Sequence, residues 1–412
     1  MEEELKQIAE DGFNSIILVV PWREFQPSMN PQRYNDYAWE KLDRVMEAAQ
    51  RQNLKVMLRV GYTWDYYSSD NVLERYEKLL YDDGTKRAWI QYAKRLYERA
   101  AVHENFCGGF ITWEDFWNFA ENSVFYGSGL AGRKMASKCG YTQYVKEHYT
   151  LEELEEMYQD TFKTYEDVYL PDSLNTYSRK AFYQFYDDFL NKILAETQAV
   201  FPDLSMEVRL DIDPVKRPDG TLEGVFHDAT FTCGSSGFTS AMYSVAMGFE
   251  SNGQELSADQ ALAGTGENLD RLSAANGGKN LYVDQFLFTD NTPGFEQNAK
   301  LTESEKSAYL DGVADIFKAK TLGYAIWTYR DYGDNKLYNP QFALDKQGRD
   351  FSSGSYIEER DGNKMAVIPS FGKISQNIKK RSAGGNGKKA HVRFWLEGDG
   401  NCRVTVQGGG KS

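Results

Sequence analysis

The sequence predicts an α/β protein with the (β/α)8 barrel fold, a TIM barrel in which the first strand is missing from the chain. Two observations support this. Helical and strand patterns alternate as far as residue 330, and such alternation is typical of parallel strands joined by helical crossovers. Seven strand patterns occur in this span, and the first helix has no strand before it. An open, doubly wound sheet of seven strands is the alternative.

The elements follow one another in pairs, a helix and then a strand. The helical patterns have apolar residues every three to four positions, as amphipathic helices require. They cover residues 2–10, 38–52, 84–102, 177–200, 257–275 and 302–320, with a last helix expected near 371–380. The strand patterns are short apolar runs, typical of strands buried on both faces. They cover residues 14–20, 54–60, 106–112, 206–210, 238–244, 280–286 and 323–328.

Two stretches fall outside this repeat. Residues 121–172 form a long insertion rich in tyrosine and charge, and we expect it to form one wall of a cleft, because loops of this length in barrels commonly line sites. Its tyrosines are expected to offer rings to a ligand; they are Tyr126, Tyr141, Tyr144 and Tyr149. The alternative is that the insertion covers the outside of the barrel or mediates self-association. Residues 1–382 are thus predicted to be the barrel, and 383–412 a linker followed by a β-hairpin or truncated β module.

Composition excludes several function classes. The net charge is −14, so an acidic surface repels nucleic acid and anionic lipid. No apolar run approaches the roughly 20 residues of a membrane span, and no secretory signal opens the chain. The four cysteines are scattered without a CxxC pair, and the four histidines lack metal-binding spacing. We therefore expect neither a metal nor another cofactor.

Aromatic and carboxylate residues recur where the predicted strands end. Active sites of barrels lie at the carboxyl ends of the strands, and aromatic rings stack on the apolar faces of sugars. The residues expected to contact sugar are Trp22, Trp64, Asp65, Trp113, Arg209, Asp211, Tyr243, Asp284 and Trp327. This pattern predicts a poly- or oligosaccharide ligand; chance enrichment of polar residues in loops is the alternative.

The segment from Gly12 to Trp22 resembles the passage from helix one to strand two in the cellulase-like retaining glycoside hydrolases, the family 5 type of clan A. The resemblance implies hydrolysis of β-linked sugars by two carboxylates, outside the cell or at its surface. It implies that Glu114, at the end of strand four, is the acid/base. Gln285, at the end of strand seven, stands at the nucleophile position, and Trp327 is the tryptophan of strand eight.

Two residues depart from the family pattern. Trp113 stands where the family has Asn, and Gln285 stands where it has the nucleophilic Glu. An amide lacks the anionic oxygen that attacks the anomeric carbon. Three explanations are open: an engineered change at Gln285, attack by the neighbouring Asp284, or a natural barrel that binds polysaccharide without cleaving it. In a regular strand Asp284 and Gln285 point to opposite faces, so only one of them is expected to face the barrel mouth.

Further roles follow from the same resemblance. Tyr243 is expected to hold residue 285 in place. Arg59 and Arg209 either bring positive charge near that residue or form ion pairs inside the barrel, and His227 either contacts sugar or lies on the surface. Asp211 and Asp213 are expected to bind sugar hydroxyls, with Ca²⁺ coordination as the alternative.

Overall fold

The structure is a computed structural model whose contacts divide the chain into two units, Met1–Ile378 and Lys379–Ser412. It describes residues 2–61, 63–64, 71–112, 119–245, 254–288, 299–327, 342, 345–346, 349–360, 363–376, 397–398, 403 and 405. The predicted hairpin strands, 390–396 and 402–407, lie outside the described residues except for Arg403 and Thr405. All that follows concerns the first unit.

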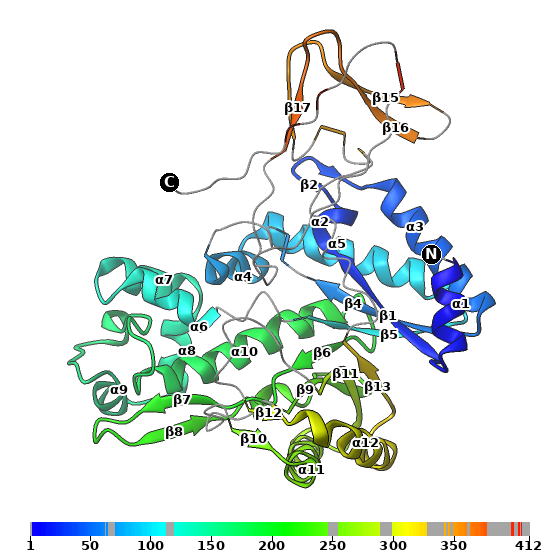
Figure 1. Cartoon of the computed structure of the whole chain (residues 1–412). Helices are drawn as coiled ribbons and strands as arrows, with labels where there is room; N and C mark the ends of the chain where they lie inside the picture. The colour runs from blue at the N-terminus through cyan, green and yellow to red at the C-terminus, as the bar shows by residue number, and fades with distance from the viewer. Residues whose placement is uncertain are drawn as a thin grey trace. The chain divides into compact units, whose positions relative to one another are not determined.

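A seven-stranded parallel sheet forms the centre of this unit (Figure 1). Its strands, in spatial order, are β1 (Ser15–Pro21), β4 (Lys55–Gly61), β5 (Phe106–Ile111), β6 (Ser205–Val208), β9 (Phe238–Ser244), β11 (Asn280–Leu287) and β13 (Tyr324–Ile326). Spatial order follows chain order, as it does in a barrel, whereas a doubly wound sheet reverses direction near its middle. The predicted strands are therefore confirmed within a few residues.

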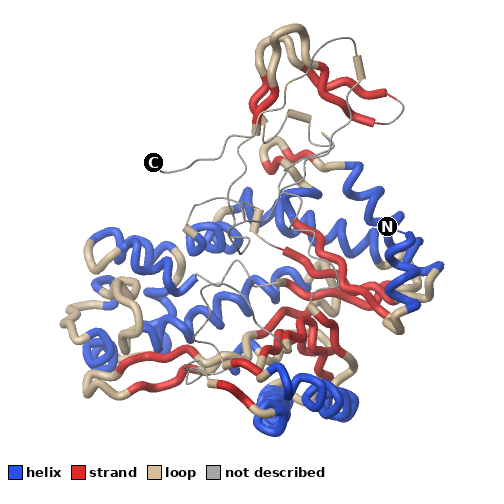
Figure 2. Tube along the Cα trace, viewed as in Figure 1, coloured by secondary structure: helices blue, strands red, loops and turns tan. Residues whose placement is uncertain are grey.

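Helices alternate with these strands along the chain (Figure 2). Those that match the predicted repeat are α1 (Glu2–Glu10), α3 (Asp36–Arg51), α5 (Asp83–Ala100), α10 (Arg179–Gln198), α11 (Ala258–Ala275) and α12 (Lys306–Lys320). Short helices that the repeat does not include are α2 (Trp22–Phe25) and α4 (Val72–Tyr81), with 3-10 turns η4 (Asp228–Thr230) and η5 (Glu303–Glu305). None of the helices within the described ranges is both long and apolar enough to cross a bilayer.

Contacts across the sheet show that it curls into a nearly closed barrel. Ile17 on β1 and Ala325 on β13, from the two ends of the strand order, pack against the same interior cluster of Met57, Phe110 and Tyr282. A flat sheet would hold these strands several strand spacings of about 4.8 Å apart. The predicted barrel is therefore confirmed.

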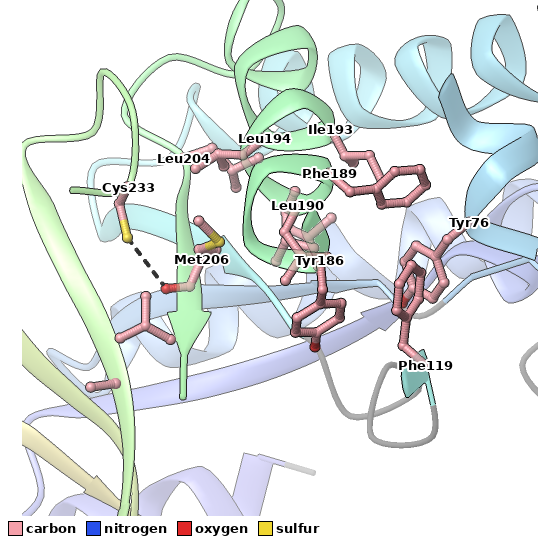
Figure 3. Packing of buried hydrophobic residues seen from close by; sticks show 14 of the residues in the cluster. Tyr76, Phe119, Tyr186, Phe189, Leu190, Ile193, Leu194, Leu204, Met206 and Cys233 are labelled. Atoms are coloured by element: carbon pink, nitrogen blue, oxygen red, sulfur yellow. Dashed lines mark hydrogen bonds between the residues drawn. The ribbon is translucent and has the colours of Figure 1, made fainter. Parts of the chain in front are cut away.

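Helix α10 packs along β6 and orients part of the site described below. It buries Leu190 and Leu194 beside Met206, whereas Phe189 packs on Phe119, and Tyr186 lies between this strand and Phe119 (Figure 3). Cys233 donates a hydrogen bond to the carbonyl oxygen of Met206. The position and rotation of α10 are thus set by buried contacts, which also set the direction of its polar side chains.

The insertion is a small helical layer on α10 and α4. It contains α6 (Phe119–Asn122), η2 (Ser123–Tyr126), α7 (Leu130–Lys138), α8 (Tyr141–His148), α9 (Leu151–Tyr158) and η3 (Tyr165–Asp167). The rings of Tyr141 and Tyr144 pack on Phe185 of α10. The hydroxyls of Tyr126 and Tyr149 bond to Glu74 and Gln184.

The prediction that these rings face a ligand is wrong for Tyr141 and Tyr144, because both are buried in the packing against α10. Amphipathic helices bury the residues of one face, and the apolar face of α8 carries these two rings.

Several short antiparallel pairs complete the unit. They are β2 (Ser28–Met29) with β3 (Gln32–Arg33), β7 (Asp213–Lys216) with β8 (Leu222–Val225), β14 (Asp350–Phe351) with β17 (Ile374–Ser375), and β15 (Tyr356–Arg360) with β16 (Asn363–Val367). One further pair, β10 (Glu255–Leu256) and β12 (Lys300–Leu301), is parallel.

A helix was expected near residues 371–380. In residues 371–376, the part that the structure describes, there is no helix, and residues 374–375 form β17 instead. Phe371 has a positive φ of 62°, a backbone conformation that a right-handed helix excludes.

Candidate active site

A layer of polar side chains lies inside the barrel near the carboxyl ends of its strands. On β4, Leu58 and Val60 pack toward the helices, whereas Met57 packs inside the barrel. Arg59 follows Met57 in the alternation, so it also points inside. The same alternation and the contacts below place Thr112, Glu207, Ser240 and Asp284 beside it, and we call these five residues the interior polar layer.

A buried ion pair dominates one side of this layer. The Nη2 atom of Arg59 lies 3.2 Å from Oε2 of Glu207, and the two side chains are only 2% and 5% exposed. The hydroxyl of Thr112 donates to the same carboxylate oxygen at 2.8 Å. The Arg59 guanidinium lies 4.6 Å from the ring centroid of Trp327, a cation–π contact. Arg59 was expected either to bring positive charge near residue 285 or to form an ion pair inside the barrel, and the structure shows the ion pair.

A β-bulge on β11 changes the expected orientation of Asp284 and Gln285. Val283 lies opposite Ala241 on β9, but Gln285, two residues on, lies opposite Met242, only one residue on. One extra residue therefore occupies β11, as in a β-bulge. Val283 and Phe286 on either side pack into the helix-facing core. The two residues between them, Asp284 and Gln285, both point inside.

The expectation that only one of these side chains faces the mouth is therefore wrong, because it assumed a regular strand. The hydroxyl of Ser240 donates to Oδ2 of Asp284 at 2.6 Å. Gln285 is only 6% exposed, and among the described residues its Oε1 atom has no hydrogen-bond donor. A buried amide oxygen in this state gains a hydrogen bond when a ligand supplies a donor.

Glu114, Trp113 and Asp65 lie outside the described residues, as does Trp117. The described chain reaches Thr112, a member of the interior polar layer, and resumes at Phe119, which is buried in the core. The root of the Glu114 segment is therefore anchored at the layer on one side and in the core on the other.

Two residues that were predicted to contact sugar, Trp22 and Tyr243, pack in the core instead. Trp22 is 1% exposed, begins α2, and packs on Trp89 of α5 with a centroid distance of 5.1 Å. Tyr243 packs toward the helices, where its hydroxyl accepts a hydrogen bond from Thr265 at 2.7 Å. The predicted sugar contact of Trp22 and the predicted hold of Tyr243 on residue 285 are therefore wrong. Tyr243 lies on the helix-facing side of β9 because of the strand alternation. Trp22 lies in α2, which packs on α5.

Trp64 and Trp327 remain partly accessible. Trp64 donates its indole N–H to the carbonyl oxygen of Gln26 at 2.7 Å, and the Arg23 guanidinium covers its ring at 4.5 Å. Trp327 is 38% exposed. Of these two rings, only Trp327 contacts the interior polar layer.

A second group of charges lies at the end of β6, next to the first. Arg209 contacts Asp211 with its Nη2 atom at 2.6 Å and Asp213 at 3.2 Å. His227, only 1% exposed, lies between Asp213, 2.7 Å from its Nε2, and Asp187, 2.8 Å from its Nδ1. The prediction of a surface position for His227 is wrong, because α10 brings Asp187 over the loop that carries it.

Beside this group lies a cavity of about 140 Å³. Its lining consists of Ala120, Glu121, Tyr183, Tyr186, Arg209, Asp211 and Asp213. Sequence reasoning missed Tyr183, Tyr186 and Asp187, because polar residues on a helix carry no sign of which strand end they will meet. Glu207 had a signal, since it alternates with Arg209 in a strand whose other residues, 206, 208 and 210, are apolar.

The charges of this group set one another's pKa values. Burial lowers the pKa of His227, but the charge of Asp187 and the hydrogen bonds that the ring donates to Asp187 and Asp213 outweigh burial and raise it to about 9. Burial raises the pKa of Asp213, but Arg209 and His227 outweigh it and hold that pKa at about 2. At neutral pH His227 is therefore an imidazolium and Asp213 a carboxylate.

This arrangement predicts a loss of stability at alkaline pH. The folded-state pKa of His227 lies above its ordinary value of 6.5, so its stabilising effect is complete below about pH 6.5 and is lost as pH rises toward 9. The free energy of unfolding should fall by about 3 kcal/mol across this window. Urea unfolding at pH 6.5 and pH 9 measures it. His227→Gln should remove most of the dependence, and His148→Gln, at an exposed histidine, should retain it. Equal slopes in all three proteins would contradict the assignment.

Within the described ranges, no group of three or more His, Cys, Asp or Glu residues is arranged to hold a metal ion. Asp211 and Asp213, for which Ca²⁺ was the alternative, pair with Arg209 instead.

No known sequence family matches the chain, and no curated protein matches it. Solved structures do resemble it. A β-galactosidase from the psychrophilic Marinomonas ef1 has a TM-score of 0.51 at 13% identity, covering 80% of this chain and 52% of that one. An exo-β-1,4-mannosidase from Opitutaceae bacterium strain TAV5 has a TM-score of 0.46 at 12% identity, covering 80% and 48%. Thermotoga maritima Cel5A, solved with cellobiose, has a TM-score of 0.41 at 12% identity, covering 80% and 83%.

The chain spans about half the length of the β-galactosidase. At this identity the similarity establishes the fold alone: the chain has the barrel fold of glycoside hydrolases.

Proposed function

We propose that the protein is a retaining glycosidase for β-linked oligo- or polysaccharides when residue 285 is Glu, and that the chain with Gln285 binds its substrate without cleaving it. The bulge on β11 carries this proposal. It directs Gln285 into the interior polar layer, where its Oε1 lacks a donor among the described residues. Glu114 follows Thr112, another member of that layer, by two residues.

In the first step of the proposed reaction, a carboxylate at position 285 attacks the anomeric carbon. The bond from that carbon to the glycosidic oxygen breaks, and Glu114 gives its proton to the departing oxygen. In the second step Glu114 takes a proton from water, whose oxygen attacks the same carbon and releases the carboxylate. Retention requires the two carboxyl groups to lie about 5 Å apart.

The interior polar layer suits this chemistry. The positive charge of Arg59 lies in the layer and is held by Glu207 and by the ring of Trp327. Because this charge is paired with Glu207, its role in the proposal is to fix the geometry of the layer. The exposed part of the Trp327 ring offers a surface on which a pyranose can stack.

A non-catalytic, polysaccharide-binding barrel is the second candidate. One observation favours it, namely that residue 285 is an amide. The residue at this position in the natural gene distinguishes the two, because Gln there favours a binder and Glu there favours an enzyme. Attack by Asp284 stays an alternative, although Ser240 already occupies one of its oxygens.

Glu114→Gln, made together with Gln285→Glu, tests the role of the acid. For substrates with poor leaving groups, kcat should fall by about 10²-fold or more, because protonation of the departing oxygen is lost. For aryl glycosides with acidic phenols the first step should change little, since such groups leave without a proton. The ratio kcat/KM, which reports the first step, is measured on a cello-oligosaccharide and on a dinitrophenyl glycoside. An equal loss of kcat/KM on both substrates would show that Glu114 is not the acid.

A further inference from the structure

We propose that the cavity of about 140 Å³ at the end of β6 binds a sugar with a free, protonated amino group, so that the preferred ligand is a β-linked amino sugar. This inference rests on the proposed function, because it names the substrate class of the same barrel. Four observations support it: the size of the cavity, its place, its charge, and its balance of hydrogen-bond donors and acceptors.

The cavity has room for one substituent of a sugar and the adjoining part of its ring. An engineered protein cavity of ~150 Å³ holds one benzene ring, which has about half as many heavy atoms as a glucosamine unit, and a water molecule occupies ~30 Å³ of the liquid. A volume of about 140 Å³ therefore exceeds what one or two bound waters need. Its polar walls also differ from those of a void left by imperfect apolar packing.

The cavity lies at the carboxyl end of β6. Arg209 and Asp211 follow this strand, the neighbour of β5 in the sheet, and Ala120 and Glu121 of α6 line the cavity as well. Active sites of barrels lie at this end of the strands. The cavity is thus at the end of the barrel where a sugar ligand is expected.

The charges around the cavity leave an excess of negative charge. Its lining includes the carboxylates of Glu121, Asp211 and Asp213 but the single cation Arg209. Behind this lining, His227 is paired with Asp187 and Asp213, and Arg179 bonds to the carbonyl oxygens of Ala120 and Ser173. Arg271 interacts with Asp211 and pairs with Asp228. Within the described part of the chain, five carboxylates thus surround four cations. A ligand with one positive charge completes the balance, whereas a uronic acid would add repulsion.

The available hydrogen-bonding groups also favour an amine. The three carboxylates that line the cavity offer only acceptors, and the donors of Arg209 are directed at Asp211 and Asp213. The hydroxyls of Tyr183 and Tyr186 can donate or accept. A protonated amine has three donors and no acceptor. An N-acetyl group replaces the protonated amine with a bulkier, uncharged group that carries an acceptor. A hydroxyl group has only one donor. The cavity therefore distinguishes the three common substituents at carbon 2 of a β-linked glucose unit.

Calorimetric titration of the chain as it stands, with Gln285, tests the proposal directly. The ligands are β-1,4-linked tetramers of glucosamine, N-acetylglucosamine and glucose, which differ only in that substituent. We expect the glucosamine tetramer to bind about tenfold more tightly than the glucose tetramer, the effect of one ionic hydrogen bond in a partly buried site. Glu121→Gln should reduce this preference several-fold without a folding defect, because Glu121 is exposed. Asp211→Asn should do the same.

A matched control is needed because a protein of net charge −14 attracts any polycation. Glu152→Gln removes the same charge from an exposed position on α9 that does not line the cavity, and it should retain the preference. Equal affinity for the three tetramers, or equal effects of Glu121→Gln and Glu152→Gln, would overturn the proposal. The proposed function fails separately, if Gln285→Glu cleaves none of these sugars while the glucosamine preference persists.

Discussion

Gln285→Glu is expected to raise kcat on β-linked substrates by about 10³-fold or more, since loss of a hydrolase nucleophile costs on the order of 10⁴–10⁶ in kcat. The side chain is already inside the barrel and buried, and Glu is nearly isosteric with Gln. The substitution therefore supplies an anionic oxygen without new packing. Hydrolysis of a panel of β-linked polysaccharides and aryl glycosides by the two proteins measures the effect.

The neighbouring Asp284 predicts how the new activity depends on pH. Two carboxylates on adjacent residues of the bulge cannot both ionise easily, so the pKa of one of them should rise. Ser240 donates a hydrogen bond to Asp284. Rates should therefore fall on the acidic side at a higher pH than for a single exposed carboxylate.

Two companion variants separate the explanations for Gln285. Gln285→Met should remain inactive, because a thioether cannot attack the anomeric carbon. Gln285→Glu combined with Asp284→Asn should keep its activity if residue 285 is the nucleophile, and it should lose activity if Asp284 attacks. Failure of Gln285→Glu to cleave any substrate while it still binds oligosaccharides would favour the binding barrel.

The second large effect concerns the ion pair between Arg59 and Glu207. Arg59→Met should reduce the free energy of unfolding by about 3–5 kcal/mol, because it leaves the buried carboxylate of Glu207 without its partner. The side chain of Glu207 is only 5% exposed, so water cannot replace the guanidinium. The hydrogen bond from Thr112 to the same carboxylate is kept in this variant and limits the loss of stability. Urea unfolding at neutral pH measures the change.

The double variant Arg59→Met with Glu207→Leu is the matched control. Replacing both charges by apolar groups of similar volume should recover much of the lost stability, since neither charge is then buried alone. A loss below about 1 kcal/mol for Arg59→Met alone would contradict the buried pair. Binding of oligosaccharides should be weaker in both variants if the charge of Arg59 also serves the site.

The seven parallel strands of the barrel could be predicted from the sequence because each is a short apolar run that follows an amphipathic helix. These patterns are local, and the strands are buried on both faces whatever their neighbours are. The same reasoning correctly anticipated polar residues at the strand ends, such as Arg209 and Asp211. The insertion helices α7 to α9 were not predicted, because their short amphipathic patterns lie within a segment that has no repeat.

Which face each side chain takes could not be predicted in the same way. Trp22 and Tyr243 stand near strand ends in the sequence, yet both belong to the helix-facing core. Asp284 and Gln285 share one face only because the pairing of β11 with β9 contains an extra residue. A bulge depends on the register between two strands, which a single strand's sequence does not specify.

The sequence by itself determined the order of the elements, the barrel fold, and the excess of rings and carboxylates at one end of the strands. Only the tertiary structure decided which charges meet. His227, Asp187 and Asp213 come from a loop, from α10 and from β7, and they form one buried group because α10 packs along β6. Local patterns arise from the periodicity of helices and strands. Pairing between residues 14 and 40 positions apart depends instead on how whole elements pack, which no local pattern carries.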